Sequence, residues 1–384
     1  MELSNRVRKL TPSLTRRLFD MAQKFPNVID LTLGDPDIVP PQIIRNAACR
    51  SIQEGNTRYS QNAGLECARK AIAVFNSKQY GHIIDPDEVI LTCGGMGALY
   101  LMLYSLLNTG DEVLIPAPYW INYKQMTQLC GGVPAIVPTF EEDNFEINAE
   151  ALAAAVTPRT RVIIINSPNN PTGRIISSDA LDTLARLAVE RNIFVISDEV
   201  YRSLIYDNKK HESIRTRPGM RERCAVIDSM SKRFSMTGYR LGYAIGPKDL
   251  IQAMTRLQEN VVACAPLPSQ YAAIAAYSQE INTCEMLHEF TLRRQVIMDG
   301  IREIPKVSLS GIDGTFYAFV NIEKTGLNSF DFATRLLKCR HVAVVPGRTY
   351  GEEYDSYIRI AFTVNCKRLK DAMSRIKTFV LEDL

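Results

Sequence analysis

Short apolar runs alternate with amphipathic stretches between about residues 89 and 246. The runs at 162–165 and 194–196 are continuously apolar, as in strands buried on both faces. Between these two runs, Leu181, Leu184 and Ala188 recur at helical spacing after Ser177 or Ser178, either of which caps a helix. The alternation predicts an α/β fold with a mostly parallel sheet covered by helices. The predicted strands are 89–93, 112–116, 161–166, 193–198, 224–229 and 241–246.

The last third of the chain has a different pattern. A long helical stretch near 285–302 precedes an apolar run at 315–322, and a helix near 330–339 precedes further runs at 343–346 and 357–362. A few strands with flanking helices predict a second, smaller α/β unit. Because no Gly/Ser linker separates the two units, we expect them to pack against each other.

Composition and charge exclude several classes of protein. Lys and Arg total 45 against 42 Asp and Glu, so the net charge of +3 gives no electrostatic case for a nucleic-acid partner. The nine cysteines are scattered and never spaced as Cys-x-x-Cys, which argues against a disulfide framework or a zinc site. The N-terminus lacks the order of a signal peptide, and no apolar run approaches the roughly 20 residues that span a bilayer. We therefore expect a cytoplasmic protein with no membrane partner.

Several common catalytic motifs are absent from the sequence. It contains no Gly-x-Gly-x-x-Gly, no Gly-x-x-x-x-Gly-Lys-Ser/Thr, no Gly-x-Ser-x-Gly and no His-Glu-x-x-His. The four histidines lie far apart without the spacing of metal ligands, and we predict no metal site. The sequence therefore lacks the motifs that usually indicate a Rossmann-type dehydrogenase, a P-loop enzyme, a serine hydrolase or a zinc protease.

Four polar clusters instead follow predicted strands, at the sheet edge where open parallel sheets bind ligands. The glycines of 93–97 let helix N-terminal amides approach an anion, although a plain Gly-rich turn has the same composition. The cluster 166–173 is a tight turn whose asparagines either bind a ligand or cap the turn. In 197–201, Asp198 lies at the end of a buried strand and needs a cationic or hydrogen-bonding partner. This partner is either a ligand or the N-terminus of a helix that the residue caps.

The fourth cluster, 228–243, places Lys232 among hydroxyls with Arg240 eight residues later. A lysine held beside cations and away from bulk water loses its proton more easily, and a neutral amine forms a Schiff base. These residues suit one phosphate and one nucleophilic lysine, whereas the alternative is a solvated basic turn.

Taken together, three of these clusters carry a family resemblance. Asn-Asn-Pro-Thr-Gly, Ser-Asp-Glu-Val-Tyr and Ser-x-Ser-Lys-x-x-x-x-x-Gly-x-Arg-x-Gly-Tyr, in this order, resemble the pyridoxal-phosphate (PLP) aminotransferases of fold type I. The similarity is to the class I/II branch that includes bacterial aspartate aminotransferases, and it extends from Leu33 to Arg359. It implies a large domain, 46–285, with a mostly parallel seven-stranded sheet, and a small domain formed by 1–45 together with 286–384.

The resemblance also implies how the cofactor is held. Lys232 would form the Schiff base with PLP and shuttle the proton, and Asp198 would pair with the protonated pyridine nitrogen. Tyr201 and Asn170 would hydrogen-bond the ring's phenolic oxygen, and Trp120, the only tryptophan, would lie over the ring unless it merely fills the core. The residues expected at the phosphate are Gly95, Met96, Ser229, Ser231 and Arg240.

For the substrate and the assembly, the resemblance implies three further roles. Arg359 would grip the α-carboxylate bidentately with the Gly34 amide beside it, and Trp120 and Asn170 would also contact substrate. Tyr59 would reach the phosphate of a neighbouring subunit, which implies a homodimer with shared active sites.

One position departs from the family pattern. Aspartate-preferring members often carry a lysine where this chain has Met96, and Ser13 and Thr15 match other residues near that pocket. Since a thioether carries no charge, strict aspartate specificity is not expected, and an aromatic or other neutral donor fits as well.

The predicted function is a PLP-dependent aminotransferase that moves an amino group from an L-amino acid to a 2-oxo acid by ping-pong half-reactions. A PLP-dependent lyase or other biosynthetic enzyme on the same scaffold retains every residue named and is the main alternative. A non-catalytic, regulatory PLP-fold protein is the other.

Overall fold

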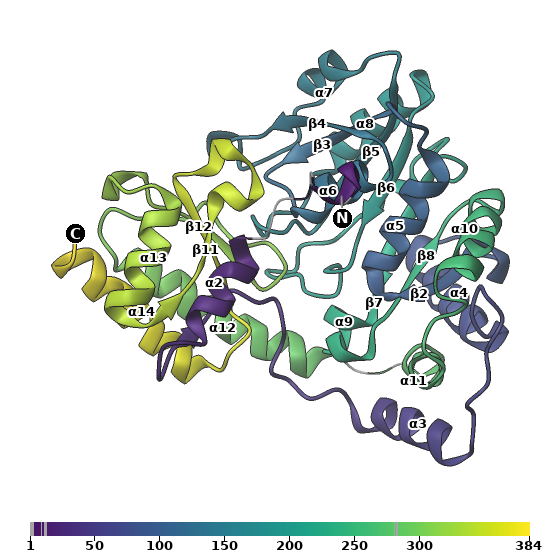
Figure 1. Ribbon diagram of the computed structural model, residues 1–384, viewed down its shortest axis with the longest axis horizontal. Helices are drawn as coiled ribbons and strands as arrows, with labels where there is room; N and C mark the ends of the chain where they lie inside the picture. The colour runs from purple at the N-terminus through teal and green to yellow at the C-terminus, as the bar shows by residue number, and fades with distance from the viewer. Residues whose placement is uncertain (1–3, 9, 11–13, 280, 282) are drawn as a thin grey trace.

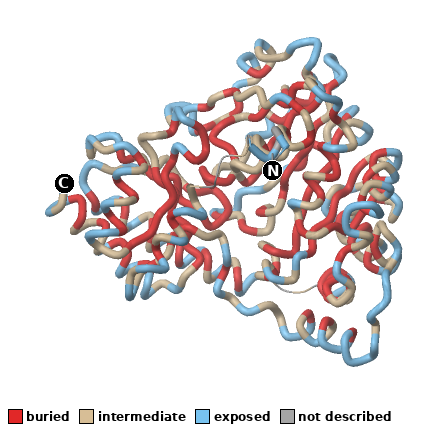
Figure 2. The backbone as a smooth tube through the Cα atoms, in the orientation of Figure 1, coloured by how far each residue is buried: buried red, intermediate tan, exposed pale blue. Residues whose placement is uncertain are grey.

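The computed structural model describes residues 4–8, 10, 14–279, 281 and 283–384. Figure 1 shows the large sheet and its helices on one side and the C-terminal helices, with the strands they pack on, on the other. Figure 2 shows that both parts have their own buried interior. No helix within the described residues is long and apolar enough to cross a membrane.

The large sheet has seven strands in the order β2-β8-β7-β6-β5-β3-β4. The pairs from β7 through β6, β5 and β3 to β4 are parallel, and β8 is antiparallel to both of its neighbours. The mostly parallel seven-stranded sheet is thereby confirmed. The strands are β2 Val89–Cys93, β3 Glu112–Ala117, β4 Val133–Pro138, β5 Thr160–Asn166, β6 Phe194–Asp198, β7 Cys224–Ser229 and β8 Leu241–Ile245.

Six of these strands lie where the apolar runs predict them, and β4 was missed. β4 is an edge strand with two prolines and mostly half-buried residues, so its sequence lacks the continuous apolar run of a central strand. The predicted helix after β5 is confirmed as α8 Ser178–Glu190, with the Ser177 hydroxyl accepting a hydrogen bond from the Ala180 amide at 3.2 Å.

Helices cover the large sheet and extend along its edges (Figure 1). Besides α8, the helices before residue 303 are α1 Asn5–Arg8, α2 Leu14–Ala22, α3 Gln42–Gln53, α4 Glu66–Tyr80, α5 Gly94–Leu106, α6 Asn122–Leu129, α7 Ala149–Ala155, α9 Met230–Arg233, α10 Lys248–Val261, α11 Leu267–Ser278 and α12 Cys284–Arg302, the last of which packs against the C-terminal helix. The α3 helix packs on α11, and α2 instead reaches the C-terminal strands.

The C-terminal part is a second, smaller α/β unit, as its pattern predicts. An antiparallel sheet has the order β11-β12-β9, and β1 pairs in parallel with β10, which joins the start of the chain to its end. The elements are β1 Ile29–Asp30, β9 Tyr317–Asn321, α13 Ser329–Arg340, β10 Val342–Ala343, β11 Val345–Pro346, β12 Tyr357–Ala361 and α14 Cys366–Glu382.

The strand register brings the polar clusters to one edge of the large sheet. Asn166 at the end of β5 pairs with Asp198 at the end of β6, and Ser229 at the end of β7 pairs with Gly242 of β8. The α5 helix starts directly after β2, so its N-terminus lies at the same edge. The sheet thus provides the floor on which a ligand site is assembled.

Candidate active site

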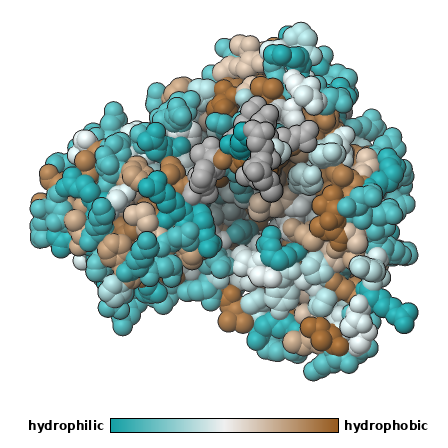
Figure 3. Space-filling view, viewed as in Figure 1, coloured by the Kyte–Doolittle hydropathy of each residue, from teal (hydrophilic) through white to brown (hydrophobic). Residues whose placement is uncertain are grey.

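A cavity of about 430 Å³ opens at this edge, between the large sheet and strands β9 and β12. Figure 3 shows the surface hollowed between the two parts of the molecule. Twelve of the thirteen site residues predicted from the sequence line the cavity: Gly34, Gly95, Met96, Trp120, Asn170, Asp198, Tyr201, Ser229, Ser231, Lys232, Arg240 and Arg359.

Three predicted positions need separate comment. Tyr59 does not line this cavity and is 88% exposed on the surface. Thr15, matched to the family pocket, does line it. Ser13, matched to the same region, lies outside the described residues.

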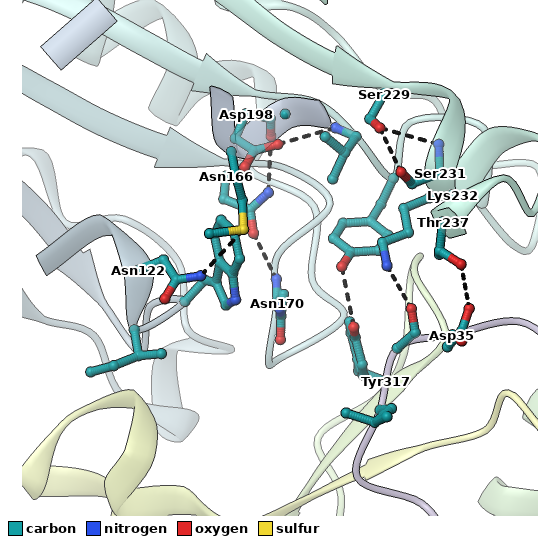
Figure 4. A pocket seen from close by; sticks show the side chains of 18 of the residues that line it. Asp35, Asn122, Asn166, Asn170, Asp198, Ser229, Ser231, Lys232, Thr237 and Tyr317 are labelled. Atoms are coloured by element: carbon teal, nitrogen blue, oxygen red, sulfur yellow. Dashed lines mark hydrogen bonds between the residues drawn. The ribbon is translucent and has the colours of Figure 1, made fainter. Parts of the chain in front are cut away.

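Lys232 projects its amine into the cavity from the short helix α9, which Ser229 caps (Figure 4). Its Nζ donates a hydrogen bond to the Gly34 carbonyl oxygen at 2.5 Å and lies 5.6 Å from the centroid of the Phe316 ring. Burial lowers the pKa of the Lys232 amine. Tyr317 and Asp35 raise this pKa in part, whereas the positive charges of Arg359 and Arg240 lower it further. The amine is therefore closer to its neutral, nucleophilic form than an exposed lysine is.

Asp198 lies at the tip of β6 and is 5% exposed. Its carboxylate accepts hydrogen bonds from the Tyr123 hydroxyl at 2.7 Å and the Val200 amide at 3.3 Å, and neither donor is charged. The pKa of this carboxyl is raised to about 6, chiefly by burial; the hydrogen bonds from Tyr123 and Val200 lower the pKa, and the carboxylates of Asp228 and Glu199 raise it. A buried acid without a charged donor fits a cationic group of a ligand.

The opposite end of the cavity is built to receive an anion. The amides at the N-terminus of α5 open toward it, and the Arg240 guanidinium lies against Gly94, where a Cβ would be 2.6 Å from Nη2. Gly94 has a φ of +74°, so both the space and the backbone require glycine there. The Ser229 and Ser231 hydroxyls lie 2.9 Å apart beside it (Figure 4). Two hydroxyls, a guanidinium and a helix N-terminus suit a phosphate.

Arg359 reaches the cavity from β12 and is 4% exposed. Its guanidinium donates to the Asn170 side-chain oxygen at 3.0 Å and to the Thr32 carbonyl, and it lies 4.2 Å from the centroid of the Tyr317 ring. Its buried Nε has no hydrogen-bond acceptor among the described residues. A buried guanidinium with a free donor suits a carboxylate ligand.

The remaining predicted residues form the walls. The Tyr201 hydroxyl lies 3.2 Å from that of Tyr317, and the Asn170 amide donates to the Asn166 side chain at 2.8 Å (Figure 4). The Trp120 ring packs edge-on against Tyr123 with centroids 5.5 Å apart while still lining the cavity. Trp120 therefore both fills space and faces the ligand.

Sequence reasoning missed several residues that the fold brings to this cavity. Tyr123, which holds Asp198, follows Trp120 by three positions, but nothing in the sequence links it to a strand 75 residues later. Tyr317 stands in an apolar run that predicts only a strand. Asp35 accepts a hydrogen bond from the Thr237 hydroxyl at 2.6 Å, between segments 202 positions apart (Figure 4).

The cavity as a whole fits PLP. The acid at one end complements a protonated ring nitrogen, the serine and arginine cluster at the other complements a phosphate, and the Lys232 amine opens into the same cavity. The Arg359 Nε, which has no acceptor within the described part of the chain, leaves one further donor that suits a substrate carboxylate.

Comparison with known proteins gives one consistent family. Residues 26–376 match the model for aminotransferase class I and II. The chain is 37% identical to an aspartate aminotransferase of Geobacillus stearothermophilus, covering 99% of each chain, and 36% identical to aromatic-amino-acid aminotransferase 2 of Thermococcus litoralis, covering 100% and 99%. The structure of the Thermus thermophilus aspartate aminotransferase with maleate superposes with a TM-score of 0.94 at 32% identity, covering 99% of this chain and 100% of that one.

Proposed function

The chain belongs to the class I and II aminotransferases, which are PLP-dependent enzymes, and from that premise we propose which of its residues carry the reaction. The observation that carries the proposal is the convergence of Lys232, Asp198 and Arg359 on one cavity. When bound, the cofactor supplies an electron sink that makes the Cα–H bond of an amino acid acidic. The substrates are an amino acid and a 2-oxo acid.

We propose Lys232 as the residue that binds the cofactor covalently and then acts as base. Burial lowers the pKa of its amine, so a larger fraction of Lys232 than of an exposed lysine is unprotonated and available to accept the proton. The Gly34 carbonyl fixes the Nζ position at 2.5 Å, so proton removal and return occur at one defined place in the cavity.

Asp198 would face the pyridine nitrogen of the cofactor. Its buried carboxylate, which Tyr123 orients, would stabilise a proton on that nitrogen. Tyr201 and Asn170 would bind the phenolic oxygen, and Trp120 would contact the ring. The phosphate would be held by Ser229, Ser231, Arg240 and the amides of Gly95 and Met96.

Arg359 orients the substrate by its α-carboxylate, with the Gly34 amide beside it. The rings of Tyr317 and Tyr350 sandwich the guanidinium at 4.2 and 5.3 Å, which holds its plane toward the cavity. Orientation of the carboxylate places one Cα–H bond beside the Lys232 amine, and this positioning is a large part of the rate acceleration.

We propose a donor with a neutral or aromatic side chain in addition to aspartate. Met96 lies at the cavity wall beside Asn122, whose Nδ2 is 3.9 Å from the Met96 sulfur, and Trp120 and Tyr350 line the same cavity. A thioether and rings stabilise apolar side chains by burial. The proposal predicts that phenylalanine or tyrosine reacts with a kcat/KM within about tenfold of that for aspartate.

We further propose a cytoplasmic homodimer in which each Tyr59 serves the neighbouring active site. The exposure of Tyr59, 88%, leaves its ring available to a second subunit. Within each subunit we propose a large domain of 46–285 and a small domain of 1–45 with 286–384, supported by the pairing of β1 with β10.

The function is tested on purified protein loaded with PLP. Addition of an amino acid is expected to shift the cofactor absorbance and release one 2-oxo acid per site without ammonia, and a 2-oxo acid is expected to restore the first spectrum. Release of ammonia would identify a lyase. An unchanged spectrum with all twenty amino acids would favour a regulatory PLP-fold protein.

A further inference from the structure

A buried network of charged and hydroxyl groups lies between the large sheet and α4. Its centre is Arg202, in the turn after β6, whose side chain is 7% exposed. The other members are buried, apart from the half-buried Tyr80, and share hydrogen bonds with one another: Asn76, Tyr80, Ser197, Glu199, Ser213, Asp228 and Tyr243. The mechanism above uses none of these side chains.

The Arg202 guanidinium joins three elements to the turn from which it projects. Its Nε donates to the Asp228 carboxylate of β7 at 3.0 Å, and its Nη2 donates to the Tyr243 hydroxyl of β8 at 3.1 Å. On α4 it donates to the Tyr80 hydroxyl at 3.0 Å and to the Asn76 side chain. A planar guanidinium fixes the directions of all these donors at once.

Two carboxylates depend on this one guanidinium. Asp228 lies 2.8 Å from Nη2, and Glu199 lies 3.9 Å from Nη1 with hydrogen bonds from Tyr80, Ser197 and Ser213. The other basic group near Glu199 is His211, at 3.9 Å, and burial lowers the pKa of that imidazole, which is therefore mostly neutral at pH 7. Arg202 thus supplies the positive charge of the network.

Members of the network alternate along the chain with residues of the cavity. Glu199 follows Asp198, Arg202 follows Tyr201, and Asp228 precedes Ser229, and the second residue named in each pair lines the cavity. On β7 the neighbouring side chains of Asp228 and Ser229 point to opposite faces of the sheet, whereas Tyr201 and Arg202 are neighbours in the turn after β6. A shift of the network therefore moves the cavity residues with it.

We propose that Arg202 is a positioning residue that sets the spacing between the two ends of the cofactor site. By joining β7 and β8 to the turn after β6, it fixes Asp198 and Tyr201 relative to Ser229 and the glycines of the phosphate end. This inference rests on the proposed binding of PLP in this cavity. Groups that support ligand-binding residues from behind commonly change affinity or activity by 10- to 100-fold when lost.

Three variants test the proposal. Arg202→Met removes both the positive charge and the planar set of guanidinium N–H donors. Arg202→Lys keeps the charge but lacks that planar set of donors. Arg215→Met is the matched control, because Arg215 is equally buried and ion-paired, with Nη2 2.7 Å from Glu88 and Nη1 2.7 Å from the carbonyl of Cys224 at the far end of β7.

The readouts are the thermal midpoint and the PLP dissociation constant, followed through Trp120, the only tryptophan, during dilution of the loaded enzyme. We expect the dissociation constant to rise about tenfold or more in Arg202→Met, less in Arg202→Lys, and less than about twofold in Arg215→Met at a similar loss of thermal midpoint. If Arg202→Met does not fold, Arg202→Lys is judged by the same criterion, with a rise above twofold expected.

Two results would overturn the proposal. One is a dissociation constant within twofold of the parent in every Arg202 variant that folds. The other is an equal rise in Arg215→Met and in the Arg202 variants, which would reflect general loss of stability. Failure of the proposed function itself gives a different result, because the unsubstituted protein would then bind no PLP at Lys232.

Discussion

At the scale of single residues, two buried charged side chains define the site's selectivity. The Nε of Arg359 has no hydrogen-bond acceptor among the described residues, and the two groups that donate hydrogen bonds to the Asp198 carboxylate are both uncharged. Both arrangements are incomplete within the described part of the chain, which supports the proposed ligand groups of opposite sign.

Arg359→Ala is expected to raise the KM for both the amino acid and the 2-oxo acid by about 100-fold, since loss of charged hydrogen bonds worth about 3 kcal/mol has that effect. Arg359→Lys is expected to recover only part of this loss, because an ammonium lacks the planar fork. Steady-state kinetics with each substrate measures the KM values of both variants, and thermal unfolding is the control for loss of stability. An unchanged KM in Arg359→Ala would remove the residue from the substrate site.

The raised pKa of Asp198 leads us to expect that the stability of the cofactor-free protein depends on pH. Its folded pKa of about 6 lies above the ordinary 3.8, so the folded state binds this proton more tightly than the unfolded chain does. The contribution of Asp198 to stability is therefore fully present below about pH 4 and is lost as the pH rises to 6.

Between pH 4 and pH 7, the free energy of unfolding of the parent is expected to fall by about 2 to 3 kcal/mol relative to that of Asp198→Asn, which carries no titrating group there. Urea unfolding of both cofactor-free proteins at several pH values provides the comparison. Parallel curves for the two proteins would contradict the raised pKa.

The sequence predicts site residues well where a short motif contains both the chemistry and its position. Lys232, Ser229, Ser231 and Arg240 fall within twelve residues and meet in the cavity. Tyr123 and Tyr317 were missed because their roles arise from packing between distant segments, and a tyrosine in an apolar run has no local feature that indicates it.

At the scale of elements, the site depends on the close approach of α5 to β8. A Cβ on Gly242 would overlap the backbone of Gly94 and Gly95, so no side chain fits between the helix N-terminus and the strand. The helix is thereby held with its free amides at the end of the cavity.

Gly242→Ala is expected to lower stability by about 1 to 3 kcal/mol through overpacking and to weaken PLP binding at least tenfold by displacing α5. Gly238→Ala is the control, because its added Cβ meets nothing within 4 Å in the same segment. Unfolding and cofactor titration of both variants measure the effect. Equal PLP affinity in the two would show that α5 is not held by this contact.

Central strands were predictable because they are buried on both faces, whereas β4 was not. At the edge of the sheet, β4 is only half-buried, and Pro134 and Pro138 interrupt its apolar run. The family resemblance, and not the pattern, gave the number seven for the strands.

At the scale of the whole molecule, segments from both ends of the chain complete the cavity. The Thr32 carbonyl accepts from Arg359, and the Gly34 carbonyl accepts from Lys232, so the N-terminal segment connects the C-terminal strands to the large sheet. Such pairings, 327 and 198 positions apart, follow from the fold alone.

The proposed shared active site predicts complementation between two inactive subunits. In a mixed dimer of one Lys232→Ala subunit and one Tyr59→Ala subunit, one of the two sites has both residues intact. Because random exchange makes about half of all dimers mixed, activity is expected at about a quarter of all sites. Activity is measured after mixing and subunit exchange, with each variant alone as the control. No gain above the sum of the separate variants would argue that Tyr59 serves no neighbouring site.

The most direct test of the account is to locate the covalent bond to PLP. Borohydride reduction of the loaded protein, followed by digestion and mass spectrometry, is expected to find the pyridoxyl-phosphate mass on the peptide containing Lys232 and to lose it in Lys232→Ala. A reduced adduct on a different lysine, or no adduct on any peptide, would contradict the assignment of this cavity as the catalytic centre.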